Sequence, residues 1–168
     1  MGFVLLLGGA RSGKSDRACR LGEDSGLPVT FIATATAGDR EMEARIGNHR
    51  DSRPSGWSTV EEPLELTAAI QAAPPDDFVI VDCLTLWVSN LLGAGRLPDE
   101  IASAAERAAR EVANRRGVVV SNEVGLGIVP GNELARTFRD VLGSVNAIFA
   151  ACAERSVLMV AGRALELT

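Results

Sequence analysis

The sequence lacks an excess of basic residues and any long apolar run. Its 168 residues contain 17 Lys and Arg against 22 Asp and Glu, a formal net charge of −5 at pH 7. A nucleic-acid-binding surface requires a basic stripe, so we expect no nucleic-acid partner. No run approaches the roughly 20 apolar residues that span a bilayer. The first residues also lack the basic segment of a secretory signal. We therefore expect a cytoplasmic protein that binds a small molecule.

Cysteine and histidine are also scarce. Cys19, Cys83 and Cys152 are far apart and form no C-x-x-C pair, so a zinc site is not expected. Unpaired cysteines fit a reduced compartment. Cys83 is most simply a small core residue. The single histidine is His49.

Lysine is nearly absent, because Lys14 is the only lysine among 17 basic residues. It lies in a stretch that fits G-x-x-x-x-G-K-[ST], the phosphate-binding loop. A short apolar run at 3–7 precedes the stretch, and residues 16–23 are expected to form a helix. Strand, glycine loop and helix are the context that this motif requires. The predicted phosphate-binding residues are Gly8, Gly9, Ala10, Arg11, Ser12, Gly13, Lys14 and Ser15.

The chemistry of such a loop follows from its backbone. Glycines allow the N–H groups to point at phosphate oxygens, and the helix N-terminus adds partial positive charge. We expect Lys14 to reach the β and γ phosphates and the Ser15 hydroxyl to bind Mg²⁺. Arg11 either contacts phosphates or is a solvated side chain.

Strands and helices alternate along the chain. Strands are expected at 29–33, 57–60, 78–82, 117–122 and 156–161, and an edge pairing at 164–167. Helices are expected at 39–50, 63–72, 84–92, 98–115 and 134–152. This alternation predicts an α/β fold with a mostly parallel sheet, flanked by helices, in a single domain over 1–168. Its ligand should bind at the carboxyl ends of the strands.

Several polar residues are candidates for that edge. Asp82 closes an apolar strand, as the second Mg²⁺ carboxylate of a phosphate-loop enzyme does. The alternative is a carboxylate that caps the next element. Asn122 and Glu123 follow another strand, where a place in the site and a helix-capping role are equally favoured. Arg136 and Arg139 either face substrate phosphates or form an exposed helix face.

His49 lies near the end of a predicted helix, with Arg45, Arg50 and Arg53 nearby. A lone histidine is usually structural or exposed. The functional alternative is a nucleophile or base beside bound phosphates, where the arginines would hold an anionic group.

The absence of further lysines excludes the N-K-x-D motif with which GTPase switch proteins recognise guanine. A small-molecule phosphotransferase or nucleotidyltransferase remains. A generic small-molecule kinase with a structural His49, and a nucleotide-dependent regulator without turnover, are the alternatives.

Longer motifs identify a family. They include the loop at 8–15, Phe-Ile-Ala-Thr at 31–34 and Glu-Met-Glu-Ala-Arg-Ile-Gly-Asn-His-Arg-Asp-Ser-Arg-Pro at 41–54. Further motifs are Trp57 through Glu61, Asp-Cys-Leu-Thr-Leu-Trp-Val-Ser-Asn-Leu-Leu at 82–92 and Ser-Asn-Glu-Val-Gly-Leu-Gly-Ile-Val-Pro at 121–130. Arg136-Thr-Phe-Arg139-Asp and Gly143-Ser-Val-Asn146 complete the pattern. Over essentially its whole length the chain resembles the bifunctional adenosylcobinamide kinase / adenosylcobinamide-phosphate guanylyltransferase family of cobalamin biosynthesis.

The resemblance implies two reactions and an assembly. Such enzymes phosphorylate adenosylcobinamide with ATP or GTP and then transfer GMP from GTP onto that phosphate. The second reaction passes through a GMP–histidine, which the motif places on His49. The family is similar in fold to RecA-type phosphate-loop NTPases and forms a trimer, so a homotrimer is implied.

The resemblance also implies a set of site residues. Lys14 and His49 would be catalytic, and Ser15 and Asp82 would bind Mg²⁺. Beyond the phosphate loop, the implied nucleotide contacts are Ala33, Thr34, Ala35, Arg50, Asp51, Ser52, Arg53, Glu61 and Asp82.

Overall fold

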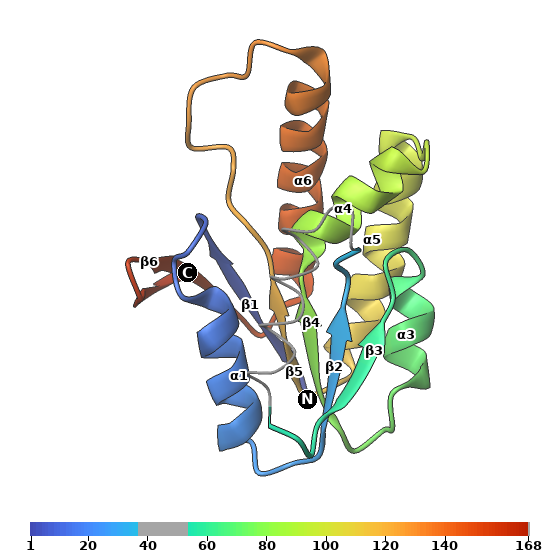
Figure 1. The fold of residues 1–168 in the computed structure, drawn as a ribbon, viewed down its shortest axis with the longest axis vertical. Helices are drawn as coiled ribbons and strands as arrows, with labels where there is room; N and C mark the ends of the chain where they lie inside the picture. The colour runs from blue at the N-terminus through green and yellow to red at the C-terminus, as the bar shows by residue number, and fades with distance from the viewer. Residues whose placement is uncertain (37–53, 168) are drawn as a thin grey trace.

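A computed structural model describes residues 1–36 and 54–167 (Figure 1). Its strands are β1 Phe3–Gly8, β2 Val29–Ala33, β3 Ser58–Glu61, β4 Phe78–Asp82, β5 Gly117–Val120, β6 Arg155–Val160 and β7 Arg163–Leu167. Its helices are α1 Lys14–Asp24, α3 Leu66–Ala72, α4 Leu84–Gly93, α5 Pro98–Ala113 and α6 Glu133–Cys152.

The strands form one seven-stranded sheet in the order β3-β2-β4-β5-β1-β6-β7. All neighbouring pairs are parallel except β6 and β7, which are antiparallel. The central strands are almost wholly buried, which explains why they read as unbroken apolar runs. The predicted α/β fold with a mostly parallel sheet is confirmed, and the edge pairing near the end of the chain is β7.

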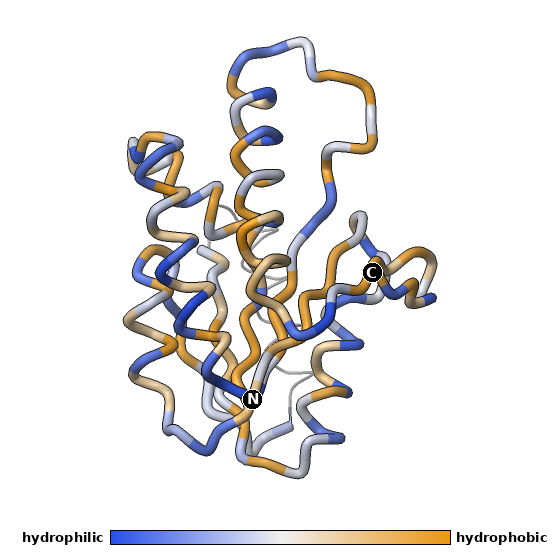
Figure 2. Tube along the Cα trace, turned by 180° about the vertical axis from the view of Figure 1, so that it is seen from behind, coloured by the Kyte–Doolittle hydropathy of each residue, from blue (hydrophilic) through white to orange (hydrophobic). Residues whose placement is uncertain are grey.

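The helices of the described residues cover the two faces of the sheet unequally. Helix α1 packs on one face over a smaller cluster that includes Leu6, Val118 and Val120. Helices α3, α4, α5 and α6 cover the other face over the larger cluster, which includes Val119. Alternate residues of β5 therefore point to opposite faces. Figure 2 shows hydrophobic residues concentrated in the central strands.

Most expected elements lie within a few residues of their predicted bounds. The helix expected from residue 63 begins at Leu66, because the Glu62 carboxylate accepts hydrogen bonds from Leu64 N and Glu65 N in the preceding turn. The strand expected to reach residue 122 ends at Val120. The helix expected at 39–50 lies outside the described residues.

Helix α6 projects beyond the sheet together with the long segment that precedes it (Figure 1). The side chains of Leu126, Ile128 and Leu134 are 85%, 98% and 72% exposed in this projection. Figure 2 shows hydrophobic residues along the same segment. The helix begins after Asn132, whose side chain accepts a hydrogen bond from Ala135 N.

Candidate active site

The phosphate loop connects β1 to α1 at the carboxyl edge of the sheet, as the sequence predicts. Gly8 and Gly13 have φ values of 150° and 93°, which favour glycine. A Cβ on Gly8 would collide with the carbonyl oxygen of Met159 on β6. The loop is therefore held by close backbone approach, which only glycine permits at Gly8.

Lys14 is buried inside this loop. Its ammonium donates hydrogen bonds to Gly9 O at 2.6 Å and to Ser12 Oγ at 3.3 Å. Burial lowers the pKa of Lys14, whereas the neighbouring Cys83 and Asp82 raise it. A bound phosphate would supply the negative charge that offsets this burial.

Asp82 and the ends of the other strands lie in one row. In the sheet register Asp82 pairs with Ala33 on one side and with Val120 on the other, and Ala33 pairs with Glu61. The predicted contacts Ala33, Glu61 and Asp82 thus share the carboxyl edge with the phosphate loop. Neighbouring strands are about 4.8 Å apart, so Glu61 on β3 lies about 19 Å along the edge from β1.

A cavity of about 430 Å³ surrounds the phosphate loop. It is lined by Ala10, Arg11, Ser12, Gly13, Lys14, Ser15, Asp16, Asp82, Cys83, Val120 and Asn122. The structure therefore brings together most of the predicted loop residues and Asp82. A hydroxyl and one carboxylate suit Mg²⁺, which takes its other ligands from phosphates and water. In the described residues no group of three or more His, Cys, Asp or Glu side chains could hold a metal by itself.

Thr34 has a supporting position. Its side chain is fully buried, donates to Cys83 O at 2.7 Å and accepts from Cys83 N at 2.9 Å. Asn90 of α4 donates to Thr34 O at 2.7 Å. These bonds join the end of β2 to the start of α4. The Thr34 hydroxyl therefore already uses its donor and one acceptor position on the backbone of Cys83.

Cys83 lines the cavity rather than lying wholly in the core. Burial raises the pKa of its thiol to about 11, and the nearby Asp82 adds to the rise. The thiol is therefore neutral at physiological pH and is not a nucleophile there.

Other candidates have ordinary surroundings or lie outside the described residues. His49 and Arg50, Asp51, Ser52 and Arg53 are outside them. Arg136 donates to Pro130 O and Gly131 O, and Arg139 pairs with Asp140 at 2.8 Å. Among the helices of residues 1–36 and 54–167, none has Asn122 as its N-cap, and the helix that follows it, α6, is capped by Asn132, so the capping alternative is wrong for Asn122.

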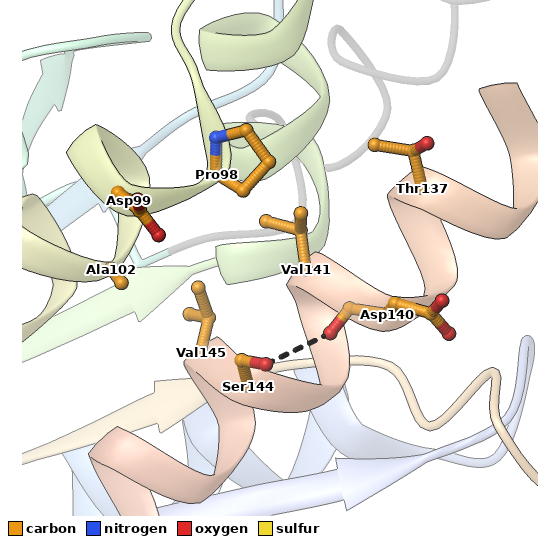
Figure 3. Close-up of a pocket in the computed structure, with 8 residues that line it drawn as sticks. All are labelled: Pro98, Asp99, Ala102, Thr137, Asp140, Val141, Ser144 and Val145. Atoms are coloured by element: carbon orange, nitrogen blue, oxygen red, sulfur yellow. Dashed lines mark hydrogen bonds between the residues drawn. The ribbon is translucent and has the colours of Figure 1, made fainter.

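A second hollow of about 350 Å³ lies between α5 and α6 (Figure 3). Its charged lining residues are Asp99 and Asp140, and Ser144 Oγ donates to Asp140 O at 3.1 Å. Two carboxylates in its lining make this hollow a less suitable place for a phosphate than the cavity at the phosphate loop, which contains the Lys14 ammonium.

The sequence motifs contain three polar residues to which the sequence analysis assigns no role. Thr85, Asn90 and Asn146 lie within helices, and all three bond to backbone at the carboxyl edge of the sheet. Their signal in the sequence is a polar residue inside an otherwise apolar helix pattern. The pattern does not reveal their partners, which come from other elements.

A phosphate loop at the carboxyl edge of a parallel sheet, with a strand-end carboxylate beside it, defines a phosphate-loop nucleotide-binding protein. The fold agrees with solved structures. A protein of Pyrococcus horikoshii OT3 has a TM-score of 0.56 at 12% identity, covering 98% of this chain and 85% of that chain. The RadB recombinase has a TM-score of 0.52 at 15% identity, covering 94% of this chain and 73% of that chain.

Sequence comparison identifies the family within this class of nucleotide-binding proteins. The pattern of the family "Cobinamide kinase / cobinamide phosphate guanyltransferase" matches residues 4–167, and the chain belongs to this family. The bifunctional adenosylcobalamin biosynthesis protein CobP of Pseudomonas aeruginosa is 47% identical over 167 residues, 97% of this chain and 95% of that protein. Its counterpart CobU of Salmonella typhimurium is 43% identical over 175 residues, 95% of this chain and 96% of that protein.

Proposed function

We propose that this chain phosphorylates adenosylcobinamide with ATP or GTP and then transfers GMP from GTP to the product, giving adenosylcobinamide-GDP. The observation that carries the proposal is the intact phosphate loop, with Lys14 at its centre, in a chain that matches the family over residues 4–167. The family's description names both a kinase and a guanyltransferase.

In the kinase reaction, the loop backbone and Lys14 hold the triphosphate. Phosphoryl transfer depends mainly on positioning and on stabilising charge, which an ammonium and oriented N–H groups provide. Ser15 and Asp82 would hold Mg²⁺, which supplies further neutralisation of phosphate charge when bound.

In the guanylyl transfer, His49 would attack the α-phosphorus of GTP, forming a nitrogen–phosphorus bond as pyrophosphate leaves. The phosphate of adenosylcobinamide phosphate would then displace the histidine nitrogen. A covalent intermediate divides a difficult reaction between two anions into two easier steps. The resemblance supports this role, and Arg50 and Arg53 would offset the phosphate charge.

Labelled GTP tests the proposal. GTP labelled at the α-phosphate should leave an acid-labile, base-stable adduct on the protein, whereas label at the γ-phosphate should appear on adenosylcobinamide. Because His49 is the only histidine, His49→Ala should abolish the adduct and leave the γ-label transfer. Transfer of the γ-label without any adduct on the native protein would favour the generic kinase.

We further propose a homotrimer in the cytoplasm. The exposed side chains of Leu126, Ile128 and Leu134 support association of the projecting segment with another copy. Cys83 and Cys152 are not in disulfide bonds, which supports a reducing compartment. In the described residues no helix is long and apolar enough to cross a membrane. Light scattering after size exclusion should give the mass of three chains, and Ile128→Asp should lower it.

A further inference from the structure

Asn146 is a buried polar residue on the apolar side of α6. It is 6% exposed and lies among Val141, Leu142, Val145 and Phe149. Its carboxamide accepts a hydrogen bond from Ser121 Oγ at 2.6 Å and donates one to Asn122 O at 3.0 Å. Burying a carboxamide is unfavourable unless its partners are in place, so these bonds fix the position of the chain after β5.

The backbone of Asn122 is held from the other helix as well. Its N–H donates to Thr85 Oγ1 of α4 at 2.8 Å. On the opposite side, Ser121 N donates to Leu6 O and Glu123 N donates to Gly8 O. The extended segment therefore continues along β1 beyond the end of β5, while side chains of α4 and α6 replace the missing strand partner.

The alternation of β5 places the Asn122 side chain on the phosphate-loop face. Val118 and Val120 belong to the cluster under α1, and Asn122 is the next residue of that row. It lines the 430 Å³ cavity together with Lys14 and Asp82. Within the described part of the chain, no hydrogen bond of its carboxamide is found, although both backbone groups are bonded.

We propose that the Asn122 carboxamide binds the terminal phosphate of the bound triphosphate, and that Thr85 and Asn146 are its positioning residues. Strand β5 lies between β4, which ends in Asp82, and β1, which leads into the loop. In phosphate-loop enzymes the loop lysine contacts the β and γ phosphates, and the carboxylate at the end of the neighbouring strand lies beside the Mg²⁺ bound to the same phosphates. Lys14 and Asp82 correspond to these two groups. Nδ2 can donate a charge-assisted hydrogen bond to a phosphate oxygen. The inference rests on triphosphate binding in the proposed function.

Paired dissociation constants for GTP and GDP, each with Mg²⁺, test the assignment. Asn122→Ala should weaken GTP binding by about tenfold, the value of one hydrogen bond to a charged group. It should leave GDP binding nearly unchanged, because GDP lacks the phosphate that Asn122 contacts. Asn122→Asp should weaken GTP further, because a carboxylate repels the phosphate.

The positioning role is tested with a matched pair of isosteric variants. Thr85→Val removes the hydroxyl that holds the Asn122 N–H. Thr30→Val removes another buried hydroxyl, which bonds to Asp77 Oδ2 at 2.6 Å near the opposite end of the sheet. Thr85→Val should reduce the preference for GTP over GDP by a few-fold, and Thr85→Ser should restore it. Thr30→Val should lower the melting temperature without changing the preference.

Each contrary result has a distinct meaning. Equal weakening of GTP and GDP by Asn122→Ala overturns the terminal-phosphate assignment, as does no weakening of either. An unchanged preference in a folded Thr85→Val protein overturns the role of Thr85. If native protein prefers GTP through Asn122 but transfers no phosphate to adenosylcobinamide, the inference stands and the proposed function fails. If native protein binds neither nucleotide, both are overturned.

Discussion

At the scale of single residues, Lys14 combines an energetically unfavourable position with a proposed role in phosphate binding. Its ammonium is buried and bonded only to oxygens of its own loop in the described structure. Burial lowers its pKa, which means that the protein alone stabilises the charged ammonium less well than water does. The nucleotide phosphates would reverse this balance.

Replacing Lys14 should separate stability from binding. We expect Lys14→Met to leave the free energy of unfolding of the nucleotide-free protein unchanged or to raise it by up to about 1 kcal/mol, because no ammonium is buried. Thermal unfolding should show no shift with Mg·GTP. Arg17→Met, an exposed change in the same helix, is the control and should keep the shift. A large loss of stability in Lys14→Met would contradict the argument.

The lowered pKa of Lys14 also predicts proton uptake. Phosphates raise the pKa of Lys14, so binding takes up a proton at a pH between its free and bound pKa values. GTP affinity should therefore fall as pH rises through the free pKa, which lies below the ordinary 10.5. Calorimetry in two buffers of different ionisation enthalpy measures this uptake. Lys14→Met, which has no group to titrate, should remove it.

The thiol of Cys83 should behave as a neutral group. Its pKa of about 11 predicts an alkylation rate that keeps rising with pH past the ordinary value of 9.0. Mass spectrometry of the Cys83 peptide after iodoacetamide treatment measures the rate. In urea-unfolded protein the rate should level off near the ordinary pKa. A plateau at that same pH in folded protein would contradict the raised pKa.

At the scale of elements, the turn between β6 and β7 supports the phosphate loop through a backbone hydrogen bond, which we call the brace. Gly162 N donates to Ser12 O at 3.0 Å. Gly162 has a φ of 75°, and a Cβ built on it would contact nothing within 4 Å. Gly95, between α4 and α5, has a φ of 79° and equally open surroundings. The two glycines differ in that Gly162 touches the loop.

This pair gives a controlled test of the brace. Gly162→Ala and Gly95→Ala should each destabilise the fold by about 1 kcal/mol, because both place a side chain at positive φ. Only Gly162→Ala should weaken Mg·GTP binding, since the strained turn moves the Ser12 carbonyl. Chemical denaturation and nucleotide titration of both variants measure the two effects. Equal affinities would show that the brace has no effect on binding.

The sequence predicts the elements better than their connections. The strands are recognisable because β1, β4 and β5 are apolar on both faces, and Gly8 to Ser15 has a motif of fixed spacing. The roles of Thr85 and Asn146 are not predictable, because their partners at Asn122 come from a strand end elsewhere in the chain. Position on a helix predicts burial, but a hydrogen bond between elements depends on register.

At the scale of the whole molecule, the predicted site residues are spread along the carboxyl edge of the sheet. Lys14 follows β1, whereas Glu61 ends β3, four strand positions away. The spacing of strands makes this about 19 Å. A residue so far from the loop is poorly placed to assist phosphoryl transfer at the terminal phosphate.

Glu61 should therefore affect one reaction more than the other. We expect Glu61→Gln to reduce the GMP adduct from α-labelled GTP by about tenfold, the cost of losing a charged hydrogen-bond partner. Transfer of the γ-label to adenosylcobinamide should change little. Glu62→Gln, at the neighbouring position, is unsuitable as a control because Glu62 bonds the turn before α3. Glu65→Gln, an exposed change, is preferable and should alter neither reaction.

The register that aligns Glu61, Ala33, Asp82 and Val120 also fixes the spacing of chemical groups along the sheet edge. Parallel strands are separated by a nearly constant distance, so groups at their ends can be moved apart only in whole steps of about 4.8 Å. Variation in the loops can change which side chain lies at each strand end, but it cannot change the distance between neighbouring strand ends. A relative that handled a longer or shorter substrate would have to use a different strand, rather than stretch the distance between two.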